Sequence, residues 1–148
     1  MTDVVDSGTR SRMMSGIRGK NTKPELLIRS QLHRKGYRFR THVAGLPGKP
    51  DIVLKRHHAI ILVHGCFWHG HNCPLFKWPA TRAEFWKAKI RQNRRNDNKT
   101  MTALRDAGWR ICIVWECSVK GASRNIPAIT GRIDRWLKGK RKFMEIGG

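Results

Sequence analysis

The sequence is poor in acidic residues for a chain of its length. Its 148 residues include 10 Asp and Glu against 31 Lys and Arg, so the formal net charge is +21. Because a compact domain this basic repels itself, the imbalance indicates a polyanionic partner, with DNA or RNA the leading candidate. A basic surface that serves only solubility is a weaker interpretation. Binding to an anionic membrane is weaker still, since no stretch has the pattern of a long basic amphipathic helix.

Long apolar runs are also missing from the sequence. The strongly apolar segment Ala59 to Val63 is far too short to cross a bilayer, and the polar, acidic start MTDVVDSGTR lacks the pattern of a signal peptide. We therefore expect a cytoplasmic protein that has no membrane partner. In that reducing compartment, the four cysteines are expected to be metal ligands or buried thiols and not disulfides.

The chain shows no internal repeat or low-complexity block, and its length fits one domain. We expect a flexible basic arm over residues 1–21, a folded domain over 22–140 and a C-terminal tail over 141–148. Capping-box spacing at Thr22 and at Thr81 predicts two helix starts. The predicted elements are a helix, three strands, a helix, a strand and a helix, over about 24–35, 37–43, 51–55, 59–65, 81–107, 109–116 and 126–138. This order predicts an α/β sandwich around a mixed central sheet flanked by helices.

One short segment, VHGCFWHGHNCPLFKWP over residues 63–79, holds three histidines, two cysteines and four large aromatic residues without a single acid. Structural zinc takes four ligands from thiolates and imidazoles in a tetrahedron. No single hairpin in this chain offers an ideal set of four. The choice of ligands therefore depends on the two distant cysteines, Cys112 and Cys117.

Strand alternation separates these two cysteines. In the strand predicted there, Ile111 and Cys117 share one face, whereas Cys112 points to the other. Cys112 is therefore interpreted as a small buried core residue, and Cys117 as free to reach a neighbouring loop. We expect the structural zinc ligands Cys66, His71, Cys73 and Cys117. Spacing alone does not decide between His69 and His71, and unpaired buried thiols beside ordinary histidines are the alternative.

Asp51 is the single carboxylate between residues 26 and 83. It follows Pro50 at the start of a predicted strand, where a fixed hard oxygen suits a magnesium ion beside a phosphodiester. The alternative is a loop aspartate that caps local amides. Glu25 also has a plain alternative, because as the third residue after Thr22 it can simply close a capping box.

The segments PGKPD, VHGCFWHGHNC, PATRAEFW and GWRICIVWEC together resemble the very short patch repair DNA endonucleases. The resemblance covers nearly the whole chain, from TRSRMM near the N-terminus to Cys117. Pro50-Asp51 followed by AIILVHG is similar to the core of the PD-(D/E)XK nuclease superfamily. However, Val63-His64-Gly65 stands where the second carboxylate and the lysine of that core are expected.

This resemblance implies a restriction-endonuclease-like core, with residues 22–140 as the endonuclease domain. It also implies an enzyme that nicks one strand 5′ of the T in a T·G mismatch. Such a mismatch arises by deamination of 5-methylcytosine, and the nick starts very short patch repair. The residues alone, without the resemblance, indicate only a basic zinc-containing protein that has a candidate magnesium site.

The resemblance also implies roles for individual active-site residues. Asp51 matches the aspartate that binds the catalytic magnesium, with the backbone carbonyl of Val63 as a further ligand. The family pattern has threonine at that position, and a backbone ligand tolerates the change to valine. His69 matches the histidine that activates the attacking water, and Glu25 and His64 match residues that support it.

Two further sets of residues follow from the same resemblance. The first set matches the ligands of the structural zinc and agrees with the strand-alternation argument: Cys66, His71, Cys73 and Cys117. The second set matches residues that enter the duplex beside the mismatch: Met14, Phe67, Trp68 and Trp86. A zinc ion that fixes this loop would leave its other side chains available for chemistry and for DNA. Trp115, on an apolar strand, is interpreted as core.

The implied partner is double-stranded DNA that contains a T·G mismatch, bound by a monomer in the bacterial nucleoid. Mismatch-repair proteins and a cytosine-5 DNA methyltransferase are further expected links. One rival hypothesis is a non-catalytic zinc-dependent nucleic-acid-binding protein, which leaves Asp51, His64 and His69 unexplained. The other is a magnesium-dependent nuclease of restriction type or one that acts on RNA, with a different specificity.

Overall fold

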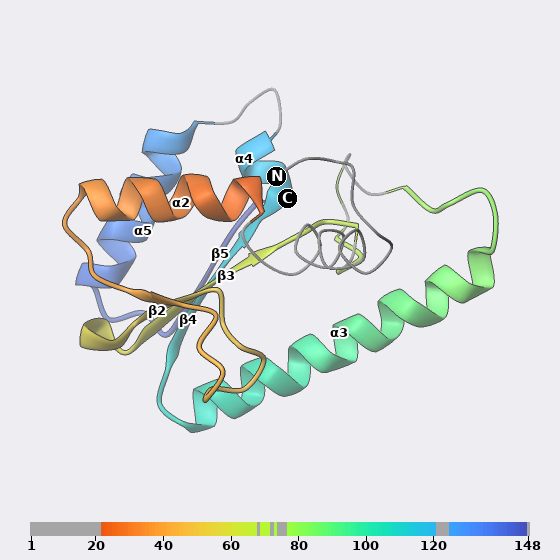
Figure 1. Ribbon diagram of the computed structural model, residues 1–148, viewed down its shortest axis with the longest axis horizontal. Helices are drawn as coiled ribbons and strands as arrows, with labels where there is room; N and C mark the ends of the chain where they lie inside the picture. The colour runs from red at the N-terminus through yellow and green to blue at the C-terminus, as the bar shows by residue number, and fades with distance from the viewer. Residues whose placement is uncertain (1–21, 68, 72, 74–76, 121–124, 148) are drawn as a thin grey trace, which may run out of the picture.

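A mixed five-stranded sheet forms the centre of the protein (Figure 1). The computed structural model describes residues 22–67, 69–71, 73, 77–120 and 125–147. The strands follow one another in chain order across the sheet: β1 (Arg40–Thr41), β2 (Ile52–Leu54), β3 (Ala59–His64), β4 (Arg110–Trp115) and β5 (Phe143–Ile146). The first three strands pair antiparallel, whereas β3, β4 and β5 are parallel. This confirms the predicted α/β class with a mixed central sheet.

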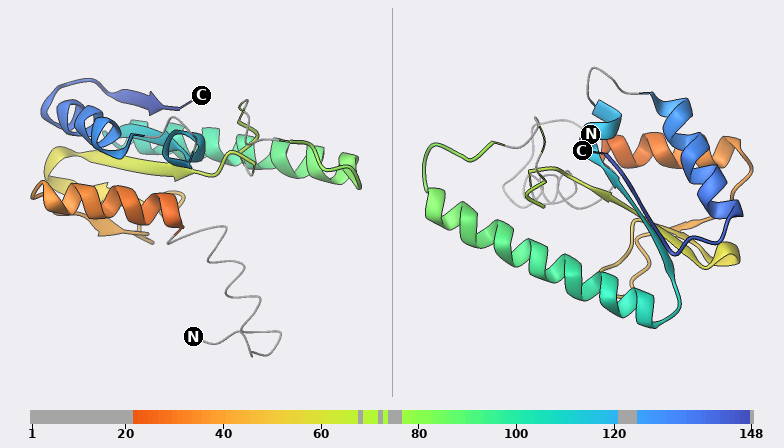
Figure 2. Two further views of the ribbon diagram at one scale, coloured as in Figure 1. Left: turned by 90° about the horizontal axis from the view of Figure 1, so that it is seen from above. Right: turned by 180° about the vertical axis from the view of Figure 1, so that it is seen from behind.

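Helices cover both faces of the sheet (Figures 1 and 2). On one face lie α2 (Lys23–Arg34) and α5 (Ile126–Lys138), and on the other lies α3 (Ala83–Asp106). The N-terminal half of α3 extends beyond the strands, next to the loop that follows β3. A short helix, α4 (Glu116–Lys120), directly follows β4. Of the helices in the described residues, none is both long and apolar enough to span a membrane.

Local sequence signals explain most helix ends. The Thr22 side chain accepts a hydrogen bond from the Glu25 amide at 3.4 Å, which confirms the predicted cap of α2. Asn125 caps α5 in the same way, through the Ala128 amide at 3.1 Å. Gly108 follows the end of α3 with a φ of +92°, a conformation that suits glycine, as predicted.

The sheet divides the core into two clusters of buried side chains. Cys112 and Val114 of β4 point to the α2 and α5 face, whereas Ile111 and Ile113 point to the α3 face. Cys117 packs against the second cluster. The strand alternation that separated Cys112 from Cys117 is therefore confirmed.

Three details of the predicted secondary structure are wrong. Thr81 does not cap α3, because Arg82 occupies the cap position with a left-handed φ of +54° and makes no side-chain cap bond. The strand predicted over 109–116 ends one residue earlier, and Glu116 and Cys117 begin the short helix α4, which was not predicted. The strand predicted over 37–43 is reduced to Arg40–Thr41, since the chain turns at His42, whose φ is +48°.

The prediction of a C-terminal tail over 141–148 is also wrong. Residues Phe143–Ile146 form β5, which pairs with the open edge of β4. Met144 and Ile146 are buried, so this strand belongs to the folded domain. Four residues in a basic terminal segment have too weak a hydrophobic pattern to predict a strand. The sequence of this segment also does not reveal that β4 has an unpaired edge to which it can bind. The predicted arm over 1–21 lies outside the described residues.

Candidate active site and metal-binding groups

The carboxyl end of β3 and the strands beside it gather three groups of ionisable side chains. The ligand atoms in each group lie within 4.8 Å of one another. The groups are Cys66, His71, Cys73 and Cys117; Glu25, His42 and Asp51; and His64, His69 and Asp97. The sheet brings them together because Asp51 precedes β2, His64 ends β3, and the parallel strand β4 leads into Cys117.

The first group contains the four residues predicted as zinc ligands. Cys117 Sγ lies 3.6 Å from His71 Nδ1, and the Cys117 amide donates to Cys66 Sγ at 3.3 Å. Burial raises the pKa of the Cys66 thiol, so this side chain stays protonated unless a bound cation stabilises its thiolate form. Three sulfurs and one imidazole nitrogen are the donors that structural zinc takes, so the residues fit that ion. His69 is not in this group.

Neighbouring side chains hold the same loop in place. The ring of His71 stacks on Trp115, with centroids 4.0 Å apart and planes 6° apart, and Trp115 Nε1 donates to Glu145 on β5. Arg94 of α3 donates to the carbonyls of His69 and Gly70. Trp115 is buried, as its interpretation as core requires, but it also orients a candidate metal ligand.

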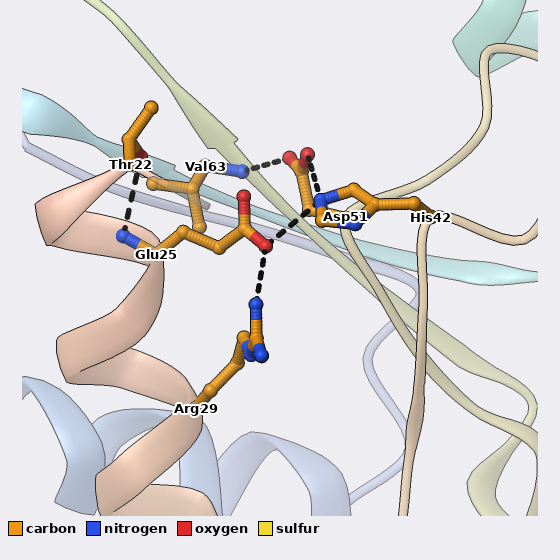
Figure 3. Close-up of polar contacts among 6 residues, drawn as sticks. All are labelled: Thr22, Glu25, Arg29, His42, Asp51 and Val63. Atoms are coloured by element: carbon orange, nitrogen blue, oxygen red, sulfur yellow. Dashed lines mark hydrogen bonds and ion pairs between the residues drawn. The ribbon is translucent and has the colours of Figure 1, made fainter. Parts of the chain in front are cut away.

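The second group consists of one buried carboxylate, Glu25, one partly buried carboxylate, Asp51, and an imidazole (Figure 3). Asp51 Oδ2 accepts a hydrogen bond from the Val63 amide at 2.8 Å. Glu25 Oε2 lies 3.1 Å from Arg29 Nη1 and 2.9 Å from His42 Nε2. Burial raises the pKa of Asp51 to about 7, and the charge of Glu25 adds to the rise while the Val63 amide opposes it. A bound cation would favour the charged carboxylates, so the group suits one.

The third group is an imidazole–carboxylate pair. His69 Nδ1 is bound to Asp97 Oδ2 of α3, which leaves Nε2 as the ring nitrogen for other contacts. The His64 and His69 rings stack with centroids 4.0 Å apart and planes 4° apart. Burial lowers the pKa of His64 to about 3, so that ring is neutral at ordinary pH. This arrangement can accept a proton at His69 while Asp97 fixes its tautomer.

Aromatic side chains lie beside these groups. Phe67, in the loop after β3, packs edge-on against Trp86 of α3 with centroids 5.4 Å apart, and Trp86 also contacts Phe85. Phe85 is 46% exposed, and the sequence analysis did not single it out. Trp68 and Met14, the other predicted DNA contacts, lie outside the described residues.

Sequence reasoning missed two residues that complete these groups. Asp97 lies in the middle of α3, and its partner His69 is 28 positions earlier, so no local spacing connects them. His42 sits in a turn, and only the pairing of β1 with β2 brings it opposite Asp51. Asp97 is the single acid between Glu84 and Asp106 in this basic helix, which was a signal for it. We find no such signal for His42.

A basic mixed α/β domain that gathers carboxylates, an imidazole–carboxylate pair and aromatic rings at one end of its sheet has the parts of a DNA-cleaving endonuclease. The chain belongs to the Vsr family of DNA mismatch endonucleases. The family model described as DNA mismatch endonuclease Vsr matches residues 2–75. The DNA mismatch endonuclease Vsr of Escherichia coli K12 is 43% identical over 147 residues, which cover 99% of this chain and 94% of that protein.

Nicking enzymes are also similar to this chain. The Type II nicking enzyme V.XorIIP of Xanthomonas oryzae pv. oryzae is 45% identical over 119 residues, which cover 80% of this chain and 88% of that enzyme. The Type II nicking enzyme V.NmeAIP of Neisseria meningitidis is 41% identical over 120 residues, which cover 81% and 86%. The resemblance stated from the sequence is thereby confirmed.

Proposed function

We propose that this endonuclease nicks one DNA strand 5′ of the T in a T·G mismatch left by deamination of 5-methylcytosine, and so starts very short patch repair. The observation that carries the proposal is that the carboxyl end of β3 bears both groups: Asp51 is bound to Val63, and the next residue, His64, stacks on the His69 that pairs with Asp97. Hydrolysis of a phosphodiester needs a proton acceptor and a cation site, and these two groups supply both.

His69 is the residue that takes the proton from the attacking water in this proposal. Its Nδ1 is held by Asp97, so Nε2 is the nitrogen that can accept. His64 stacks on His69 and fixes the plane of its ring. Glu25, bound by Arg29 and close to His42, supports Asp51 from α2. A positioned base of this kind typically contributes about 10²–10⁴-fold to the rate.

Asp51 and the backbone carbonyl of Val63 are the proposed ligands of a catalytic magnesium ion. When bound, the ion would stabilise the negative charge that develops on the scissile phosphate. The Asp51–Val63 hydrogen bond already fixes the carboxylate against β3, so the ligand is held in place before a cation arrives. Cys66, His71, Cys73 and Cys117 would hold a structural zinc that fixes the loop.

The aromatic residues next to the loop account for recognition of the mismatch in this proposal. Inserting rings between base steps costs a few kcal/mol of stacking, and the cost is least where a mismatch has already weakened the stack. Phe67 and Trp86 pack together beside the active-site histidines, with Trp68 proposed to act with them. Met14 of the basic arm is proposed to enter from the other groove, and the net charge of +21 provides the phosphate contacts.

The test is a nicking assay on matched and T·G duplexes, with and without magnesium. We expect magnesium-dependent nicks 5′ of the T in the mismatched duplex only. Equal nicking of matched and mismatched DNA would instead favour a nuclease of restriction type, and binding without cleavage would favour a non-catalytic protein. Varying the flanking bases would then identify the methyltransferase target with which the enzyme is linked. A pull-down with purified mismatch-repair proteins tests that further expected partnership.

A further inference from the structure

His42 is a nitrogen donor that the geometry places at the carboxylate group. Its Nε2 lies 2.9 Å from Glu25 Oε2 and 3.9 Å from Asp51 Oδ1, and its side chain is 15% exposed. The three side chains come from three separate segments: Glu25 from α2, His42 from the turn after β1, and Asp51 from the position directly before β2. In Figure 3 dashed lines join the ring of His42 to both carboxylates.

The contact between His42 and Glu25 is close, but it is not a good hydrogen bond. His42 Nε2 is buried, and among the described residues it has no hydrogen-bond partner of acceptable geometry. Buried polar atoms without a partner are rare in folded proteins and call for an explanation. A cation between the three side chains would provide one, because it would bind the nitrogen lone pair and both carboxylates.

The backbone fixes His42 in this position. Its amide donates to the carbonyl of Asp51 at 3.3 Å, which extends the β1–β2 ladder by one residue. Its φ of +48° lies in the left-handed region, which few non-glycine residues adopt. Strained positions of this kind gather at ligand sites, where the surrounding structure holds them.

We propose that His42 Nε2 is a metal ligand and that, together with Glu25 and Asp51, it makes this site bind Mn²⁺ more tightly than Mg²⁺. Magnesium prefers oxygen ligands and near-ideal octahedral geometry, whereas Mn²⁺, a transition-metal ion, accepts oxygen ligands as well and binds imidazole nitrogen more readily than Mg²⁺ does. A neutral nitrogen donor therefore adds affinity for Mn²⁺ and little for Mg²⁺. The inference rests on the proposed use of Asp51 in metal binding, and it adds a ligand and a metal preference to it.

The experiment measures metal binding by zinc-loaded protein without DNA, at a pH above the ordinary imidazole range. Mn²⁺ binding is followed from the loss of the free-ion electron paramagnetic resonance signal, and Mg²⁺ binding from its competition with Mn²⁺. Losing an outer contact typically costs about 10–100-fold in metal affinity. We therefore expect His42→Gln to weaken Mn²⁺ binding at least ~10-fold and Mg²⁺ binding less than ~3-fold.

A matched control is available at His58, which is exposed, has a φ of +49° and belongs to none of the three groups found among the described residues. His58→Gln makes the same chemical change on the same kind of backbone and should leave both metals unaffected. Spin-echo modulation from a nitrogen bound to Mn²⁺ should be present in the native protein and in His69→Ala. It should be absent in His42→Gln.

Three outcomes would overturn the proposal. The first is nitrogen modulation that persists in His42→Gln, and the second is equal weakening of both metals. The third is tighter binding of both metals by the variant, which would show that His42 acts as a competing cation. If His42→Gln melts at a lower temperature, His42→Asn provides a second variant, because asparagine tolerates left-handed backbone.

These outcomes are separate from a failure of the proposed function. A protein that binds Mn²⁺ through His42 but does not nick a T·G duplex would keep this inference and lose the proposed activity. A protein that nicks the mismatch and shows no nitrogen ligand would do the reverse.

Discussion

Two of the groups at the end of β3 differ in what they can hold. One has three thiols and an imidazole, and the other has two carboxylates and an imidazole. Three thiolates and an imidazole would complete a tetrahedron around a zinc ion, so that group, once occupied, would be closed to substrate. Two carboxylates and one nitrogen leave coordination positions open, as a site that must also bind a phosphate requires.

The comparison explains why acids are scarce in this part of the chain. Val63 and Cys66 are three positions apart, yet they serve different groups. Because residues 63–79 contain no acid, the carboxylates of the two groups that offer oxygen donors come from other segments, as Glu25, Asp51 and Asp97. The loop can therefore select a soft ion while the strand beside it selects a harder one.

The largest expected effect is on the group formed by Glu25, His42 and Asp51, which leaves coordination positions open. Asp51→Ala removes the proposed main ligand of the catalytic magnesium, and a metal ion contributes several kcal/mol of transition-state stabilisation, so nicking should fall by at least ~10³-fold. Binding to a T·G duplex should survive. Single-turnover nicking and a binding titration measure the two effects. Asp106→Ala, which changes an exposed acid at the end of α3, is the control and should nick normally.

The next effect separates the two histidines of the loop. His69→Ala should slow nicking by about 10²–10⁴-fold and keep zinc at full occupancy, because His69 pairs with Asp97 and lies outside the thiol group. His71→Ala should lose zinc. Metal analysis beside single-turnover rates tests this. If His69→Ala nicked normally and lost zinc, the two assignments would have to be exchanged.

The closed group should respond in stability more than in chemistry. Cys117→Ser should weaken zinc binding by more than the roughly 10–100-fold that a lost outer contact costs, and it should lower the melting temperature. Cys112→Ser is the matched control: Cys112 is buried on the opposite face, so zinc content should not change. Loss of zinc in Cys112→Ser alone would contradict the separation of the two cysteines.

A smaller effect is expected at Phe67, the described loop residue that we propose contacts DNA. Phe67→Ala should reduce the preference for T·G over matched duplexes by ~1–3 kcal/mol, the range of base–aromatic stacking. Phe39→Ala, which removes a partly buried ring on the other face of the sheet, should lower stability and leave the preference intact. Nicking assays on both duplexes measure the preference, and thermal melts of the same variants measure the stability. A Phe67→Ala variant that only lost stability would assign Phe67 to the core.

The smallest effect concerns an ionisable pair that belongs to no metal-ligand group. Tyr37 donates to Asp134; burial and this partner raise the pKa of Tyr37 to about 12, while the bond lowers the pKa of Asp134. A raised tyrosine pKa stabilises the fold below about pH 10, and the gain is lost as pH rises towards 12. A lowered aspartate pKa stabilises above its ordinary value, and that gain is lost in acid.

Tyr37→Phe removes both contributions. The stability difference between the native protein and this variant should be largest near neutral pH and shrink in both acid and strong base. Urea unfolding across pH measures it, and chelators should not alter the pattern. A difference that stayed constant with pH would mean that only packing was lost.

Local signals in the sequence predicted the helix ends and strand faces that position the site, but not the contacts that His42 and Asp97 make in it. The Thr22 cap, the end of α3 before Gly108 and the opposite facing of Cys112 and Cys117 depend on neighbours within a few residues. They could therefore be derived from spacing. His42 and Asp97 join their groups only through strand pairing and the course of α3. In both groups the contacts join segments that are far apart in the sequence, and hydrophobic periodicity does not predict which distant segments come into contact.

The position of Cys117 on α4 has a consequence for how the protein is made. The ribosome delivers Cys66, His71 and Cys73 first, and at ~5–20 residues per second Cys117 follows Cys73 by about 2–9 s. Until then, nascent chains have only three of the four expected zinc ligands, and Cys117 is not yet there to complete the set. Oxidising stress or zinc starvation during translation should therefore lower the yield of folded enzyme, while molecules already completed stay intact.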